Sequence, residues 1–200
     1  MANLKETILN PILKGNPITV LVLGICSSLA VTVQLKGACV MALSVIAVTG
    51  LSSLVVSLLR NTIPNRVRII VQLVVVAMMV ILLDQILKAF AYDVDKQLSV
   101  YIGLIITNCI VMGRIEAFAL GNKPIPSLLD GLANGFGYGL ILVIVAFFRE
   151  LLGSGTIFGL QVLPAGYVPN NLVILPPFAL ILLGCIIWVH RACDKDLQEK

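Results

Sequence analysis

Charged side chains are scarce in this sequence. Only 12% of its 200 residues are Asp, Glu, Lys or Arg, whereas 59% are hydrophobic. Water-soluble domains carry roughly a quarter charged residues, so this composition excludes an ordinary soluble domain and indicates an integral membrane protein. Alternating short strands are also lacking, which argues against an outer-membrane barrel. The net charge of +4 comes from basic residues between hydrophobic segments, so it does not indicate nucleic-acid binding.

Long hydrophobic runs make up most of the sequence. A helix of roughly 20 apolar residues crosses a ~30 Å hydrocarbon core. The sequence predicts an all-α protein with six transmembrane helices, at residues 17–35, 39–59, 67–91, 98–119, 132–152 and 172–190. Breaker-rich stretches such as "QLKGA", "RNTIPNRVR" and "LGNKPIPSLLDG" are predicted to connect them. Spans one and four are interrupted helices, because "GICSS" and "TNC" fall inside them.

The basic residues predict the orientation. With six spans both termini lie on one side of the membrane, and that side collects ten of the 14 Lys and Arg residues. They are Lys5, Lys14, Arg60, Arg66, Arg68, Arg114, Lys123, Arg191, Lys195 and Lys200. Positive residues are enriched on the cytoplasmic side, so both termini are expected in the cytoplasm.

The two halves of the chain show a faint repeat. Aligning Cys26 with Cys109 places spans one to three over spans four to six. Each half then has an odd number of spans, so we expect one membrane domain, 1–200, with inverted repeats at 1–96 and 97–200. Interrupted helices at corresponding positions of such repeats indicate a site near the middle of the membrane, because broken backbone there needs polar partners.

Histidine is nearly absent, and no C-x-x-C pair is present. The only histidine, His190, falls at the end of span six. Of the five cysteines, Cys39, Cys185 and Cys193 are interpreted as small hydrophobic residues. Cys26 and Cys109 differ, because each lies near the middle of an interrupted span, at a similar depth.

Three interpretations of Cys26 and Cys109 compete. Close helix packing is the simplest, and the residues alone favour it. A disulfide is disfavoured in a chain with cytoplasmic termini. Metal ligation is the third, since thiolates suit iron–sulfur clusters, Cu(I) and Zn. Such centres take four ligands and this depth offers two, so a metal site would be half a site completed by a second chain.

Several stretches resemble one known family. They are "LGICSSLAVT", "VSLLRNTIPNRVRIIVQ", "LDQILKAFAYDVDKQLSVYIGLIITNCIVMGRIEAFA", "PIPSLLDGLANGFGYG" and "FFRELLGSGTIFGLQVLP". From about residue 8 to 190, the chain resembles the family of D subunits of Na+-translocating NADH:quinone oxidoreductases. Related families are the membrane subunit of the Rnf ferredoxin:NAD+ oxidoreductase and the sister E subunit. "IGLIITNCIVMGRIEAFA" favours the D subunit over the Rnf subunit, and a shorter segment around "PAGYVPNN" is the main departure.

The resemblance implies a function and a cofactor. Members are multi-pass proteins of the bacterial inner membrane, in a translocase that oxidises NADH, reduces ubiquinone and exports Na+. The D and E subunits share an intramembrane [2Fe–2S] centre that relays electrons, and each contributes two cysteines. Carried over to this chain, the ligands of iron are Cys26 and Cys109. The other subunits of the complex are A, B, C and F. They hold NAD, FAD, FMN, riboflavin and quinone, so no catalytic residue is expected in this chain.

Other polar residues have more than one interpretation. Ser27, Thr107 and Asn108 are expected either to donate hydrogen bonds to the cysteine sulfurs or to cap the helix breaks. There are three alternative functions. The chain could be the homologous subunit of the Rnf complex, a secondary transporter with inverted repeats, or a purely structural scaffold subunit.

The charged residues near the span ends are expected mainly to mark the membrane interface. Arg114 and Glu116 are two residues apart and should not pair with each other. An interfacial anchor is favoured for Arg114 over capping carbonyls or binding a partner. Asp84 is expected at the outer interface rather than on a Na+ path. The adjacent residues 149 and 150 are expected to form an interfacial pair, and "NGFGYG" a helix-packing face.

Overall fold

A computed structural model describes residues 16–64, 66–90, 101–157, 160–161 and 171–193. The regular secondary structure of the described part is helical except for one antiparallel pair of two-residue strands, β1 and β2. The elements are α2 (Ile25–Val31), α3 (Leu35–Leu59), α4 (Arg68–Phe90), α6 (Ile102–Ile106), α7 (Cys109–Arg114), the π-helix η1 (Ile115–Ala119), α8 (Pro124–Gly153), β1 (Thr156–Ile157), β2 (Leu160–Gln161), α9 (Asn171–Ile174) and α10 (Pro176–Cys193).

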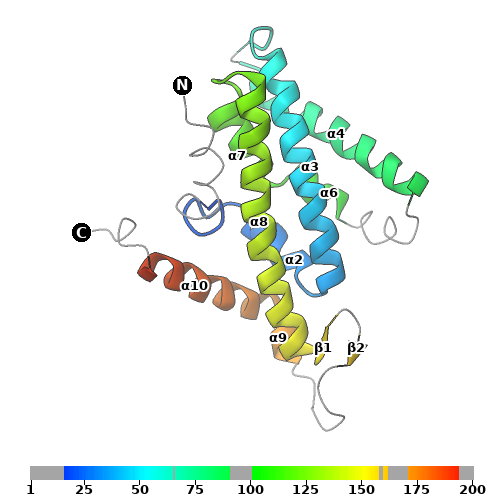
Figure 1. The fold of residues 1–200 in the computed structure, drawn as a ribbon, viewed down its shortest axis with the longest axis vertical. Helices are drawn as coiled ribbons and strands as arrows, with labels where there is room; N and C mark the ends of the chain where they lie inside the picture. The colour runs from blue at the N-terminus through cyan, green and yellow to red at the C-terminus, as the bar shows by residue number, and fades with distance from the viewer. Residues whose placement is uncertain (1–15, 65, 91–100, 158–159, 162–170, 194–200) are drawn as a thin grey trace.

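Helices α3 and α8 form the centre of the molecule and run side by side along its long axis (Figure 1). Their close contact depends on glycines of α8 spaced four residues apart. A Cβ atom added at Gly131 would lie 2.8 Å from Thr49 O, and one at Gly135 would lie 2.8 Å from Ile46 Cα. Small residues at this spacing let two helix backbones approach each other. The predicted packing role of "NGFGYG" is therefore confirmed.

Helices α4 and α10 project away from this central pair, on opposite sides of it (Figure 1). Three helices of the described part are long and apolar enough to cross a membrane, namely α3, α4 over Arg68–Ile86, and α8, whereas α10 is a shorter apolar helix. Only 28% of the α4 window is buried inside the chain, against 61% for α8. Many large hydrophobic side chains of α4 are exposed, as expected for contact with lipid or another subunit.

Two predicted helix boundaries are wrong. The fifth predicted span begins at Pro124 and not at residue 132, so part of the expected connection "LGNKPIPSLLDG" is helical. Proline is well tolerated in the first turn of a helix, where its missing N–H has no partner to lose. The second span begins at Leu35 and not at residue 39, so most of "QLKGA" is also helical.

Spans one and four are interrupted, as the polar insertions predict. In the first, residues 17–24 form turns and irregular backbone, and only Ile25–Val31 is helical. In the fourth, α6 ends at Ile106 and α7 begins at Cys109. The last predicted span is also divided, because Leu175 precedes two prolines and separates α9 from α10.

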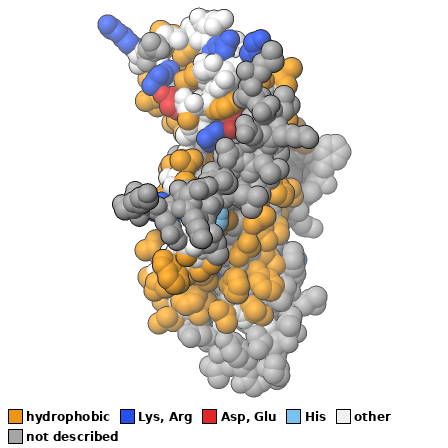
Figure 2. All heavy atoms as spheres, turned by 60° about the vertical axis from the view of Figure 1, so that its left-hand side comes forward, with side chains coloured by type: hydrophobic (Ala, Val, Ile, Leu, Met, Phe, Trp, Pro, Cys, Tyr) orange, Lys and Arg blue, Asp and Glu red, His pale blue; other side chains and the backbone are white. Residues whose placement is uncertain are grey.

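Basic side chains gather at one end of the face shown in Figure 2, whereas hydrophobic side chains cover much of the remainder. The end where α3 finishes and α8 begins carries Arg60, whose Nη1 donates to Asn122 O at 2.8 Å. The proposed repeat boundary at residues 96 and 97 and the terminal lysines at 5, 14, 195 and 200 lie outside the described residues. The number of membrane crossings and the inverted repeat therefore stay predictions.

Candidate functional site

The break before α7 is built by Asn108. This residue is extended, with φ −68° and ψ 120°, and its Oδ1 accepts a hydrogen bond from Ile110 N at 3.2 Å. Asparagine at this position caps a helix start by replacing the missing intrahelical acceptor. Cys109 follows as the first residue of α7, and its side chain is exposed. The break therefore presents a thiol at the surface of an otherwise apolar segment.

The break before α2 depends on two residues with positive φ. Gly24 has φ 79°, and Val22 has φ 56°, a conformation that β-branched residues rarely adopt. A Cβ at Gly24 would also lie 2.8 Å from Ile110 Cδ1, so a side chain at this position would require Ile110 to move. Cys26 is the second residue of α2 and is exposed. The contact of Gly24 with Ile110 brings the two breaks together, although they are far apart in sequence.

A buried tyrosine of α8 lies behind both breaks. Tyr138 is 0% exposed, and its hydroxyl is 2.8 Å from Ser27 Oγ. Its Cε2 would be 3.1 Å from a Cβ at Gly24. The sequence interpretation missed Tyr138, because it lies within the glycine-rich packing segment. The available signal was a tyrosine within an apolar span, because a buried tyrosine hydroxyl needs a hydrogen-bond partner.

The three polar residues beside the cysteines all serve the helix breaks. Ser27 Oγ donates to Gly24 O at 3.0 Å, and Thr107 Oγ1 donates to Gly103 O at 2.9 Å. Asn108 caps α7, as described above. Capping is therefore the role that the contacts in the described part of the chain support.

The thiols whose surroundings the structure describes are free. Cys26, Cys39, Cys109 and Cys185 form no disulfide, and Cys39 is half-buried whereas Cys185 is exposed. Among the described residues, no group of three or more His, Cys, Asp or Glu side chains is arranged to hold a metal ion. Cys26 and Cys109 are thus two thiols without further ligands in the described part of their own chain.

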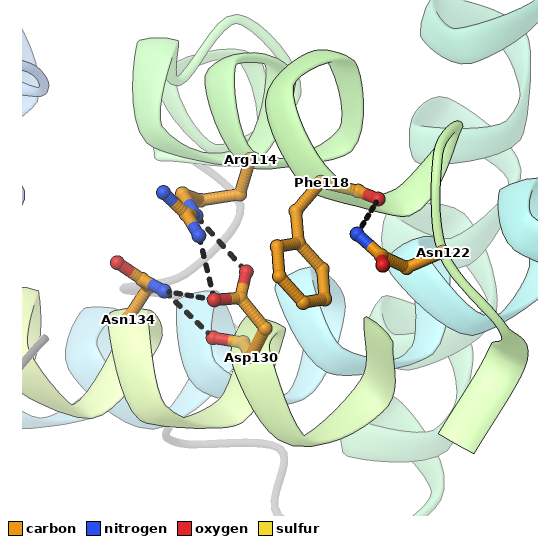
Figure 3. Close-up of polar contacts among 5 residues, drawn as sticks. All are labelled: Arg114, Phe118, Asn122, Asp130 and Asn134. Carbon is orange, nitrogen blue, oxygen red and sulfur yellow. Dashed lines mark hydrogen bonds and ion pairs between the residues drawn. The ribbon is translucent and has the colours of Figure 1, made fainter. Parts of the chain in front are cut away.

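Arg114 is the last residue of α7, and its side chain binds residues of the same chain. Its Nε donates to Asp130 Oδ2 at 3.0 Å and its Nη2 to Asp130 Oδ1 at 2.6 Å (Figure 3). Asn134 Nδ2 donates to the same carboxylate at 3.1 Å, and the guanidinium lies 5.8 Å from the centre of the Phe118 ring. The expected role of Arg114 as an interfacial anchor is wrong, because its side chain is only 18% exposed and pairs with α8.

Glu116 points to a different helix from Arg114, as their spacing predicts. Its carboxylate forms an ion pair with Arg68 and accepts a hydrogen bond from Gln72 Nε2 at 2.7 Å. Glu116 lies in the π-helix η1, and an inserted π-turn shifts the register of the residues that follow it. The C-terminal end of the Cys109 half-helix is therefore held by α8 through Arg114 and by α4 through Glu116.

Arg149 holds the C-terminal end of the other half-helix. It is 1% exposed, and its Nη1 donates to Leu29 O at 3.0 Å and to Thr32 Oγ1 at 2.6 Å. Its Nη2 donates to Ile174 O at 2.5 Å, at the end of α9. A guanidinium offers five donors in a fixed plane, which suits several carbonyl groups at helix ends.

Glu150 binds the start of α3. Its Oε2 accepts a hydrogen bond from Leu35 N at 2.6 Å. Glu150 is 6% exposed and Arg149 is 1% exposed, so the expectation of an interfacial pair is wrong and both residues belong to the interior. Asp84 is also buried, at 6% exposed, and accepts a hydrogen bond from Lys88 Nζ at 2.6 Å.

Comparison with known proteins places the chain among membrane subunits. A family model described as "Rnf-Nqr subunit, membrane protein" matches residues 4–187. The D subunit of the Na(+)-translocating NADH-quinone reductase of Aeromonas hydrophila subsp. hydrophila is 57% identical over 205 aligned residues, covering 100% of this chain and 98% of that protein. The protein of the same name from Aeromonas salmonicida is 56% identical over 205 aligned residues, with the same coverage.

Proposed function

Because the chain belongs to the Rnf-Nqr family of membrane subunits, we propose that it acts as the D subunit of a Na+-translocating NADH–quinone reductase. In this role it relays electrons through an intramembrane [2Fe–2S] centre, of which Cys26 and Cys109 form this chain's half. NADH oxidation, quinone reduction and Na+ export are properties of the whole complex. The names of the relatives, at 57% and 56% identity over the full chain, support this assignment.

One observation carries the proposal for the site. Cys26 and Cys109 each lie in the first turn of a helix that begins inside an apolar segment, and both are exposed. The contact between Gly24 and Ile110 joins the two helix starts. Unpaired cysteines are usually buried. Cys185 is exposed as well, so the first-turn position inside an apolar segment, together with exposure, sets Cys26 and Cys109 apart.

The residues present fit half of such a centre. Thiolates are the usual ligands of iron–sulfur clusters, and first-turn positions provide backbone N–H groups without intrahelical partners. Such groups stabilise a thiolate. Two more thiolates are required, and the described part of this chain does not bring them to the site. A pseudo-symmetric partner, the E subunit of the complex, would supply them at the exposed side of the breaks.

A centre in the middle of the membrane has a clear purpose. When bound, it would carry single electrons across a ~30 Å apolar layer that is too thick for one productive transfer. The protein's own part is to hold two thiols in a fixed relation and to exclude water around them. The anchors Arg114, Glu116 and Arg149 serve this part, because they fix the far ends of both half-helices.

Reciprocal contacts support the inverted-repeat architecture that we propose. Arg60, just after α3, donates to Asn122 O before α8. Arg149, near the end of α8, donates to Thr32 Oγ1 before α3. Each arginine thus binds the segment between a half-helix and the following long helix. This relation is the one expected for two equivalent halves inserted in opposite senses.

The remaining A, B, C and F subunits are proposed as further partners and as the sites of NAD, FAD, FMN, riboflavin and quinone. The basic end of the molecule, which holds Arg60, Arg68 and Lys123, is proposed to face the cytoplasm together with both termini. The membrane in question would be the bacterial inner membrane.

The assembled complex allows a direct test. We expect Cys26→Ala and Cys109→Ala each to reduce NADH-driven quinone reduction to background, whereas NADH oxidation with an artificial acceptor at the flavin subunit continues. Cys39→Ala and Cys185→Ala serve as matched controls and should keep quinone reduction. Normal quinone reduction in both single variants would overturn the relay and favour a transporter or a structural scaffold.

A further inference from the structure

Tyr138 stands out among the buried polar residues because it contacts one helix break and lies close to the other. It lies near the middle of α8 with no exposed surface. Its ring packs against Gly24, and Gly24 in turn contacts Ile110 of α7. Its hydroxyl is 2.8 Å from Ser27 Oγ, and Ser27 directly follows Cys26.

The second break lies close to the same hydroxyl. The side chain of Asn108, which directly precedes Cys109, lies within reach of the Tyr138 hydroxyl. Asn108 is 3% exposed, and its Nδ2 is buried without a well-formed hydrogen bond to any residue that the structure describes. A buried amide donor is costly when it is left unpaired. The Tyr138 hydroxyl lies near this unpaired amide and is also the partner of Ser27 Oγ.

We propose that Tyr138 is a positioning residue that links the two thiol-bearing half-helices and fixes Cys26 relative to Cys109. The ring packs against Gly24, and the hydroxyl binds Ser27 next to Cys26 and lies near Asn108 next to Cys109. A single side chain of α8 thereby reaches the surroundings of both thiols. The identity of the bound centre rests on the proposed function, whereas the linkage of the two thiols does not.

Tyr138→Phe tests this linkage, because it removes only the hydroxyl and keeps the ring. The matched control is Tyr101→Phe, whose ring contacts Gly37 at the start of α3 and not Gly24. Each variant is studied in the full complex in its native membrane. One sample keeps its iron, and a second is treated with a chelator and reductant so that the thiols react with a maleimide.

The labelling rates of Cys26 and Cys109 are the first measurement, with exposed Cys185 as the internal reference. We expect Tyr138→Phe to change both rates about two- to tenfold, the factor that corresponds to one neutral hydrogen bond. Tyr101→Phe should leave both rates unchanged. A change at Cys26 alone, or at neither cysteine, would overturn the linkage.

The second measurement is the ratio of reduced to oxidised iron centre, with the sample held at the midpoint potential of the wild type. It should shift about two- to tenfold in Tyr138→Phe at unchanged iron content, because the thiol environment differs. A structural defect would instead lower the iron content. If the wild-type complex held no iron centre while both labelling rates still changed, the proposed function would fail and the linkage would stand.

Ser27→Ala provides an independent route if Tyr138→Phe does not assemble. It removes the partner hydroxyl 2.8 Å away, so it should also change both labelling rates. Where all variants assemble, the double variant should change the rates less than the two single variants together, because both substitutions remove the Tyr138–Ser27 hydrogen bond, although Ser27→Ala also removes the bond to Gly24 O. Fully additive effects of the two substitutions would contradict the linkage.

Discussion

Two hydrogen bonds join the guanidinium of Arg114 to the carboxylate of Asp130, with Nε–Oδ2 at 3.0 Å and Nη2–Oδ1 at 2.6 Å. The pair ties the end of the Cys109 half-helix to α8. Asp130 is 5% exposed at its side chain, so removing the arginine would leave a buried carboxylate without its charged partner.

Breaking this pair should be strongly destabilising. We expect Asp130→Ala or Arg114→Ala to lower the free energy of unfolding by about 3–5 kcal/mol, seen as a fall in Tm of the detergent-solubilised chain. The double variant with apolar residues of similar size, Arg114→Met with Asp130→Leu, should recover much of the loss, because no lone charge remains. Lys123→Ala, at an exposed position nearby, is the control and should have little effect. Equal Tm values for Asp130→Ala and Lys123→Ala would contradict the role given to the pair.

The ion pair of Glu116 with Arg68 should matter much less. The two side chains are 36% and 43% exposed, so water screens the attraction between them. Glu116→Gln is expected to lower the free energy of unfolding by at most about 1 kcal/mol, and added salt should reduce the difference further. The comparison uses Tm at low and high salt. A loss as large as that of Asp130→Ala would show that Glu116 does more than pair at the surface.

Arg149 should be difficult to replace, because its partners are backbone carbonyls. Arg149→Met leaves the carbonyls of Leu29 and Ile174 without these donors, at a cost of about 1–3 kcal/mol for each buried group. Arg149→Lys should recover only part of the stability, since an ammonium group lacks the planar set of donors. Thermal unfolding of the full chain measures both. Arg191→Met, on the exposed side of α10, is the matched control. Full stability in Arg149→Lys would argue that only the charge matters.

The close approach of α3 and α8 gives a packing prediction. A Cβ at Gly135 would lie 2.8 Å from the Cα of Ile46, which is backbone and cannot rotate away. Gly135→Ala should therefore destabilise the chain by about 1–3 kcal/mol, because the two helices must separate. A Cβ at Gly184 meets nothing within 4 Å, so Gly184→Ala should be neutral or slightly stabilising through helix propensity. A neutral Gly135→Ala would mean that the helices are not held at this distance.

Local signals in the sequence were sufficient to locate the breaks. "GICSS" and "TNC" interrupt apolar runs, and both interruptions are present, at Gly24 and at Asn108. The start of α8 was misplaced because polar residues lower the hydrophobicity of its first turns. The Asp130 side chain responsible for part of that polarity is satisfied by Arg114, which lies outside α8.

Long-range partners could not be predicted in the same way. The pairing of Arg114 with Asp130 depends on how α7 and α8 pack, and η1 changes the helix register between them. The role of Tyr138 depends on two breaks that are far apart in sequence meeting against one ring. Such contacts follow from tertiary packing, which hydrophobic periodicity does not describe.

The central claim is that Cys26 and Cys109 supply half of an intramembrane iron–sulfur centre. The most direct measurement counts iron and acid-labile sulfide in the purified complex, for the wild type and for the double variant Cys26→Ala with Cys109→Ala. Cys185→Ala is the control, since Cys185 is also an exposed thiol of an apolar helix. The account predicts that the double variant loses about two iron and two sulfide per complex, the content of one [2Fe–2S] centre, while the control loses none. Unchanged iron and sulfide in an assembled double variant would contradict it.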